Sequence, residues 1–316
     1  MKSPSRFGRR RVAVCVGMIL GLVAFIAFPD RAKACACGCG VFEVGSGLMR
    51  PIQVGGFASF EYDYMNQNQN WSGTSKAPAE DNDDKQIRTN FYNANFQYMF
   101  NTKWGVLANV PVWNRYFLTA DDGELAAYHY TSLGDIRLTG VYSGFSEDMC
   151  TGVTFGLKLP TGDYTYPGPD RDNQIGTGSV NSLVGGYHQG SLTRDNSWAW
   201  FAQVLWDNAL TWRNGYRPGD EVDLAAGVYF NAGQLSSKSS IAPVLTVLFS
   251  QRWRDTGDEA DPDNTGFTRV LIAPAIQFTY SDIQVFAQVG FPVYQNMNGN
   301  QLVSKEYYKF SIGYSF

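Results

Sequence analysis

The chain ends with Lys305-Glu-Tyr-Tyr-Lys-Phe-Ser-Ile-Gly-Tyr-Ser-Phe316, in which two kinds of side chain alternate without a break. The apolar positions are Tyr308, Phe310, Ile312, Tyr314 and Phe316. The opposite face carries Tyr307, Lys309, Ser311, Gly313 and Ser315. This pattern is typical of a transmembrane β-strand, which points apolar side chains to lipid and polar ones to the lumen. A strand of a soluble β-sandwich also alternates, so the rest of the chain must decide.

The composition favours a barrel over a helical membrane protein. The chain has 316 residues, of which 17% are charged and 15% aromatic, and its mean hydropathy is −0.24. Helical spans would need about 20 consecutive apolar residues each and would raise that mean. Barrel strands alternate apolar and polar residues, so their mean hydropathy stays close to that of a soluble protein.

The N-terminus has the features of a secretory signal. Four arginines between Arg6 and Arg11 precede an apolar or small run at 12–28, and Ala32-Lys33-Ala34 fits a cleavage site. We expect residues 1–34 to be removed, although an uncleaved inner-membrane anchor has a similar pattern.

Cleavage would make the protein distinctly acidic. Residues 1–34 contain seven of the 25 Lys and Arg and one of the 29 Asp and Glu. The remaining 18 basic and 28 acidic residues give a net charge of −10. Binding to nucleic acid requires a basic surface, so this charge argues against a nucleic-acid partner.

Alternating segments continue through the chain from residue 53. We predict strands at 53–65, 87–100, 104–117, 133–145, 149–160, 176–189, 197–212, 221–232, 240–254, 267–280, 283–295 and 305–316. The links between them are alternately long and short, as in barrels that keep short turns in the periplasm and long loops outside. The sequence therefore predicts an all-β fold: a transmembrane antiparallel up-and-down β-barrel of about twelve strands over 53–316. A Cys- and Gly-rich periplasmic segment at 35–52 precedes it, and a sandwich or jelly roll is the alternative fold.

Three stretches in the middle of the chain carry a family resemblance. They are Leu133-Gly-Asp-Ile-Arg-Leu-Thr-Gly-Val-Tyr142, Gly156-Leu-Lys-Leu-Pro-Thr-Gly-Asp-Tyr164 and Ile175-Gly-Thr-Gly-Ser-Val-Asn-Ser-Leu-Val-Gly-Gly-Tyr187. They resemble the outer-membrane β-barrel channel family named for transport in the meta pathway of phenol degradation. The resemblance extends from about residue 53 to the end. It implies a channel in the bacterial outer membrane, often encoded near genes for the breakdown of aromatic compounds.

The alternation also predicts which polar side chains face the lumen. The candidate solute path is Glu61, Asp63, Asn93, Asn95, Gln97, Asp135, Arg137, Lys158, Asp223, Arg252, Arg269 and Gln288. Acids and bases are equal in number, so no ring of a single sign is expected. The interior of a barrel of about eight strands is filled by side chains, and a barrel of 16–18 strands encloses an open channel. A barrel of about twelve strands is therefore expected to enclose a narrow path. We expect passive uptake of small solutes, including small aromatic or hydrophobic compounds; the alternative is an interior closed by its own polar pairs.

Four cysteines remain after cleavage: Cys35, Cys37, Cys39 and Cys150. In an oxidising compartment they could form two disulfides. Closely spaced thiolates also suit a soft metal such as copper or zinc, and Cys35 could instead carry a lipid. The alternative function is therefore a non-transporting barrel that presents this segment to a soft metal or to a redox partner.

The remaining expectations concern partners and catalysis. Acidic residues cluster at 80–84 and 255–263, where solvated loops or divalent-cation contacts with lipopolysaccharide are expected. His129 and His188 do not fit the His-x-Ser motif of barrel phospholipases, so we predict no enzyme and no cofactor outside the Cys cluster. The expected partners are outer-membrane lipid, lipopolysaccharide, a small solute and a periplasmic partner of the N-terminal segment.

Overall fold

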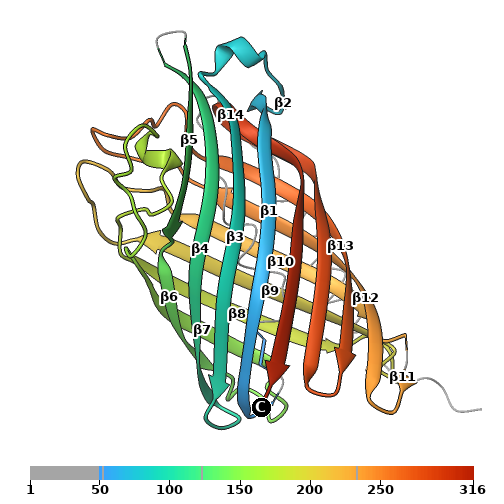
Figure 1. Ribbon diagram of the computed structural model, residues 1–316. Helices are drawn as coiled ribbons and strands as arrows, with labels where there is room; N and C mark the ends of the chain where they lie inside the picture. Colours follow the sequence, from blue (N-terminus) through green and yellow to red (C-terminus); the bar gives the residue numbers. More distant parts are fainter. Residues whose placement is uncertain (1–49, 52, 122–123, 233) are drawn as a thin grey trace, which may run out of the picture. The chain divides into compact units, whose positions relative to one another are not determined.

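The computed structural model describes residues 50–316 apart from 52, 122–123 and 233 (Figure 1). The expected signal at 1–34 and Cys35, Cys37 and Cys39 lie outside these residues. All described residues belong to one compact unit. No helix within the described ranges is long and apolar enough to cross a membrane.

Eleven strand elements of the described chain form one closed antiparallel ring. In ring order they are β1 (Gly55–Gly73), β3 (Asp84–Met99), β4 (Trp104–Asp121), β6 (Ile136–Tyr142), β7 (Thr151–Leu159), β8 (Asn181–Ser191), β9 (Trp198–Ala209), β10 (Glu221–Phe230), β12 (Ser239–Arg252), β13 (Phe267–Tyr280) and β14 (Ile283–Ser315). Three further strands pair with a single neighbour: β2 (Ser75–Lys76) with β1, β5 (Glu124–Leu133) with β4, and β11 (Gln234–Ser236) with β12. Two short 3₁₀ helices are η3 (Ala79–Asp81) and η4 (Arg171–Asn173). The structure therefore confirms a closed, antiparallel, all-β barrel.

The C-terminal stretch closes the ring against the first strand. Tyr308 lies opposite Tyr64 and Ser315 opposite Phe57. Beyond the last residue of β14, Gly56 N–H donates to Phe316 O at 2.7 Å and Phe316 N–H donates to Gly56 O at 2.9 Å. Closure leaves the ring without an edge, so its backbone groups need no partner from the surroundings.

The two faces of the C-terminal stretch separate as the alternation predicts. Phe310 and Ile312 are each 46% exposed, whereas Lys309 is 2% exposed. The same outward apolar face occurs on the neighbouring strands, for example at Phe60 and Phe96. This outer belt has the character of a lipid-facing surface.

The strands extend further than the sequence predicts. The segment 66–86 was expected to be a loop, but β1 continues to Gly73 and β3 begins at Asp84. The expected loop at 118–132 is mostly the β4–β5 hairpin. The backbone hydrogen bonds between strands continue beyond the apolar belt. Outward side chains are solvated there and can be polar, so a polar composition does not mark the end of a strand.

The last two predicted strands form the single 33-residue element β14. Its first part, Ile283–Met297, pairs with β13, and its second part, Met297–Ser315, pairs with β1. Gly299 lies between them with a φ of +77°, a conformation that glycine adopts at little cost. The expected link at 296–304 is therefore a tight reversal inside β14. The two arms of β14 correspond to the last two predicted strands, so the eleven elements supply twelve antiparallel strands to the ring.

The two ends of the barrel differ in their links. One end, here the turn end, carries 100–103, 192–197 and 281–282, and the C-terminus lies beside it (Figure 1). The other, the loop end, carries the longer links 160–180 and 253–266. The link 160–180 joins β7 to β8 and contains η4.

A charge placed on the belt should be far more costly than the same charge placed beyond it. Phe310→Arg puts a cation on the outer face about midway along the membrane-spanning part of β14, where a barrel loses about 2–4 kcal/mol. Leu125→Arg, on the β4–β5 extension, is the matched control, and its expected cost is about 0–1 kcal/mol. The free energy of unfolding in lipid vesicles checks both. Equal losses would show that the belt does not face lipid.

Candidate functional site

Two cavities lie inside the barrel and adjoin each other. The loop-end cavity has a volume of about 210 Å³ and the turn-end cavity about 150 Å³. Phe57 and Gln97 line both, so these two side chains form the neck between them. The ring of Phe57 covers Gly313 of the C-terminal stretch, where a Cβ atom would collide with it. The glycine on this polar face therefore makes room for the aromatic ring at the neck.

The first charged cluster in the loop-end cavity comes from β1 and β14. Lys309 Nζ lies 2.7 Å from Glu61 Oε1 and 3.5 Å from Asp63 Oδ1. Asn93 Nδ2 donates to Asp63 Oδ2 at 2.9 Å. Two carboxylates thus share one ammonium, and all three side chains are almost fully buried. Desolvated charges need such partners, since an isolated buried charge costs several kcal/mol.

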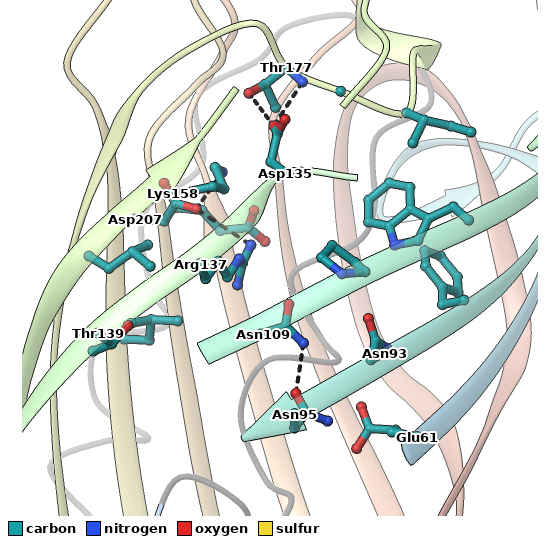
Figure 2. Close-up of a pocket in the computed structure, with 18 of the residues that line it drawn as sticks. Glu61, Asn93, Asn95, Asn109, Asp135, Arg137, Thr139, Lys158, Thr177 and Asp207 are labelled. Carbon is teal, nitrogen blue, oxygen red and sulfur yellow. Dashed lines mark hydrogen bonds and ion pairs between the residues drawn. The ribbon is translucent and has the colours of Figure 1, made fainter. Parts of the chain in front are cut away.

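The second charged cluster has the opposite proportion of charges. Asp207 Oδ2 lies 2.5 Å from Lys158 Nζ and 3.8 Å from Arg137 Nη2, and Asn181 Nδ2 donates to Asp207 Oδ1. Here two cations share one carboxylate. Figure 2 shows Arg137, Lys158 and Asp207 close together on one side of the pocket, with Asn95 and Asn109 between them and Glu61. Asn109 Nδ2 donates to Asn95 Oδ1 at 2.7 Å.

The link 160–180 folds over the loop-end cavity and is fixed there by Asp135. That carboxylate accepts hydrogen bonds from Gly162 N–H at 3.0 Å, Thr177 N–H at 2.9 Å and Thr177 Oγ1 at 2.6 Å. Both sides of the link are therefore held by one side chain. The resulting inward loop supplies Arg171, Asp172 and the run 174–177 to the cavity wall.

The middle of the inward loop has its own anchors. Asn173 is fully buried; its carbonyl accepts from Arg115 Nη1 at 2.7 Å, and its Nδ2 donates to Asp84 Oδ2 at 3.0 Å. Arg171 places its guanidinium over the rings of Tyr164 and Tyr216, 4.9 and 4.5 Å from their centres. These contacts come from β3, β4 and the neighbouring loop, so the inward loop is a fixed part of the mouth.

Aromatic and charged side chains share the walls of these cavities. In the loop-end cavity, Phe91 and Trp113 meet edge to face with ring centres 4.8 Å apart. In the turn-end cavity, the Arg50 guanidinium lies 3.9 Å from the centre of the Phe201 ring and donates to Gln189 Oε1 at 3.4 Å. The interior is therefore amphipathic at both levels.

The structure brings most of the predicted lumen residues to one cavity. Eight line the loop-end cavity: Glu61, Asn93, Asn95, Gln97, Asp135, Arg137, Lys158 and Arg252. The other four point inward but are occupied by neighbours. Asp63 contacts Lys309, Asp223 accepts from Ser250, Arg269 lies over Phe267, and Gln288 accepts from Tyr307.

Other residues of the site were not singled out from the sequence. Phe57 has the same parity as Glu61, Phe91 as Asn93, and Trp113 and Arg115 as Asn109. Their parity marks them as inward-facing, but three of the four are aromatic and do not match the polar pattern expected of a lumen face. The inward loop has no alternation, so nothing in its pattern placed residues 171–177 in the lumen.

Cys150 is the one cysteine of the predicted cluster that the structure describes. It is free, half-buried and directly before β7 at the turn end. Burial, with the nearby Asp148 carboxylate, raises the pKa of the Cys150 thiol to about 11, so the thiol is protonated at neutral pH. Within the described residues, no group of three or more His, Cys, Asp or Glu could hold a metal ion.

Comparisons with solved structures show that the fold of this barrel is similar to that of a bacterial outer-membrane channel. The COG4313 outer membrane channel from Pseudomonas putida F1 has a TM-score of 0.64 at 14% identity, over 87% of this chain and 100% of that one. The β-domain of the Bordetella autotransporter BrkA has a TM-score of 0.47 at 12% identity, over 84% and 100% of the two chains. The first likeness shows a shared fold. No protein-family model and no curated protein matches this sequence.

Removing the Asp135 carboxylate should release the inward loop. Asp135→Ala leaves three donors without their acceptor, and each lost partner costs about 1–3 kcal/mol. In hydrogen exchange, the free energy of opening at the amides of Gly162 and Thr177 should fall by about 1–3 kcal/mol. Asp163→Ala is the control, because among the described residues the Asp163 side chain bonds only to Thr165, within its own turn. Unchanged exchange in Asp135→Ala would contradict the tether.

Asp84 should make the stability of the loop end depend on pH. Burial raises the pKa of this carboxyl, which lies beyond the apolar belt, from 3.8 to about 6. The folded state therefore binds the proton more tightly than the unfolded state. The contribution to stability is largest below about pH 4, falls as the pH rises towards 6, and is constant above it.

Relative to Asp84→Asn, the free energy of unfolding of the wild type should fall by about 2.4 kcal/mol between pH 4 and pH 7. Chemical unfolding of both proteins at the two pH values measures this difference. A difference that does not change with pH would show that Asp84 is not buried as described.

Proposed function

We propose that this protein is an outer-membrane channel for the passive passage of small solutes. The observation that carries the proposal is the pair of adjoining lumen cavities, which share Phe57 and Gln97 inside a closed barrel. The inward loop lines the loop-end cavity, and Gln53 and Gln284 line the turn-end cavity. The two cavities together therefore reach both ends of the barrel. The fold shared with an outer-membrane channel supports the same function.

The size of the path limits the solutes. Cavities of about 210 and 150 Å³ lie below the 300–1,000 Å³ of drug-sized sites. A protein cavity of about 150 Å³ holds one benzene molecule. The proposed solutes are therefore of amino-acid or single-ring size.

The lining favours solutes with both polar and apolar parts. Five acidic and five basic residues line the loop-end cavity, so the site has no single sign. The edge-to-face pair of Phe91 and Trp113 offers an apolar surface to an aromatic or aliphatic body. Small aromatic compounds therefore remain within the proposed range.

The orientation follows from the links and the termini. We place the turn end in the periplasm and the loop end outside, because barrels keep short turns on the periplasmic side. The inward loop then forms the external mouth, and Arg50 and Gln53 line the cavity at the periplasmic side. The alternative function is the presentation of the cysteines to a soft metal or a redox partner, and Cys35, Cys37 and Cys39 lie outside the described residues.

Widening the neck should increase flux. Phe57→Ala removes the ring between the two cavities, and flux of sugars, amino acids and small aromatics into proteoliposomes should rise several-fold. Phe60→Ala, on the lipid face of the same strand, is the matched control and should leave flux unchanged. If folded wild type and Phe57→Ala both pass nothing above empty vesicles, the channel function is wrong.

A further inference from the structure

We propose that the turn-end cavity binds small carboxylates with an apolar body, and that Arg50 holds their carboxylate group. The proposal deepens the channel function and, as a statement about the solute, rests on it. Its basis is the charge and the lining of the turn-end cavity, which differ from those of the loop-end cavity.

Arg50 carries the only charge among the described residues that line the turn-end cavity. The polar side chains beside it are neutral, for example Gln189, Tyr229 and Gln284. The loop-end cavity, by contrast, is lined by five acidic and five basic residues. A carboxylate that enters the turn-end cavity would therefore meet one cation and no competing acid in the described wall, whereas a cationic solute would be repelled.

The contacts of Arg50 leave N–H groups for such a solute. The guanidinium carbon Cζ lies 3.9 Å from the centre of the Phe201 ring, a contact that uses the flat face of the group. Nη1 donates to Gln189 Oε1 at 3.4 Å, and Nε is buried without a hydrogen-bond partner among the described residues. A buried donor without an acceptor is costly, and a carboxylate oxygen would satisfy it with a charge-assisted hydrogen bond.

The guanidinium is held in place by two neighbouring strands. Gln189 on β8 and Phe201 on β9 are cross-strand partners, so the hydrogen bond and the ring contact come from adjacent positions of the wall. A guanidinium fixed in this way binds a carboxylate with less loss of side-chain freedom than an exposed arginine would.

The rest of the cavity suits an apolar body. Phe57, Val244 and Phe286 line it together with Arg50. Its volume of about 150 Å³ is close to that of a protein cavity that holds one benzene molecule. The Tyr229 hydroxyl lines the same space and is able to donate a second hydrogen bond to a carboxylate. A single ring that carries one carboxylate therefore matches both the size and the chemistry of the cavity.

The experiment compares three ligands of one shape by calorimetric titration of the folded, purified protein in detergent micelles at pH 7. They are benzoate as the anion, benzamide as the neutral molecule and benzylamine, which is a cation at this pH; each is corrected for protein-free micelles. Wild type should bind benzoate about tenfold more tightly than benzamide, the factor expected when a charge-assisted hydrogen bond replaces a neutral one. Benzylamine should bind more weakly than benzamide.

Two variants test the assignment to Arg50. Arg50→Gln should lower the affinity for benzoate to that for benzamide and leave the affinity for benzamide unchanged. Arg194→Gln is the matched control, because Arg194 is an exposed arginine of the turn-end link 192–197 outside the described wall of the cavity. It removes the same charge from the same end and should leave all three affinities unchanged.

Three outcomes would overturn the site. They are equal affinities of wild type for benzoate and benzamide, a preference for benzoate that persists in Arg50→Gln, and an equal loss of that preference in Arg194→Gln.

Sugar flux into proteoliposomes of the same preparations separates this proposal from the channel function. Equal flux through wild type and Arg50→Gln shows that the variant is folded and open, so a lost benzoate preference then belongs to the site. Absence of flux with benzoate binding intact would overturn the channel function and the role of benzoate as a solute, and would leave the binding site.

Discussion

The barrel depends on the backbone pairing between β1 and the C-terminal half of β14. In lipid no water is present to satisfy an open strand edge, and each unpaired group costs several kcal/mol. The contact of Gly56 with Phe316 continues that pairing to the last residue. Once the ring is closed, alternate residues of each strand must face either lipid or a narrow interior. The apolar belt and the charged lumen are two results of this one constraint.

A narrow interior that contains charges must also pair them. The structure does so with two small clusters of opposite proportion, around Lys309 and around Asp207. It also uses a loop as a lumen wall, with Asp135 and Asn173 as its attachment points. Such pairing is costly to desolvate and rarely adds stability over apolar packing. Four members of these clusters line the loop-end cavity: Glu61, Arg137, Lys158 and Asp207.

The strand alternation predicted the parts of the fold that lipid imposes. Lys309 inside and Phe310 outside follow from parity alone, and so does the inward direction of Glu61 and Arg137. The positions of strand ends could not be predicted in this way, because beyond the belt both faces can be polar, as at Asn66–Asn70. The inward loop could not be predicted either. Its place depends on single contacts such as Thr177 with Asp135, which join residues 42 positions apart. Phe57 was overlooked because an aromatic side chain in a lumen does not match the polar-in pattern.

The central claim is that the barrel encloses a continuous path for small solutes. Single-channel recording of the purified protein in a planar lipid bilayer tests it most directly. We expect discrete, small conductance steps that appear only with folded protein, in keeping with a neck lined by Phe57 and Gln97. A membrane that contains inserted, folded protein and shows no steps above baseline would contradict the account.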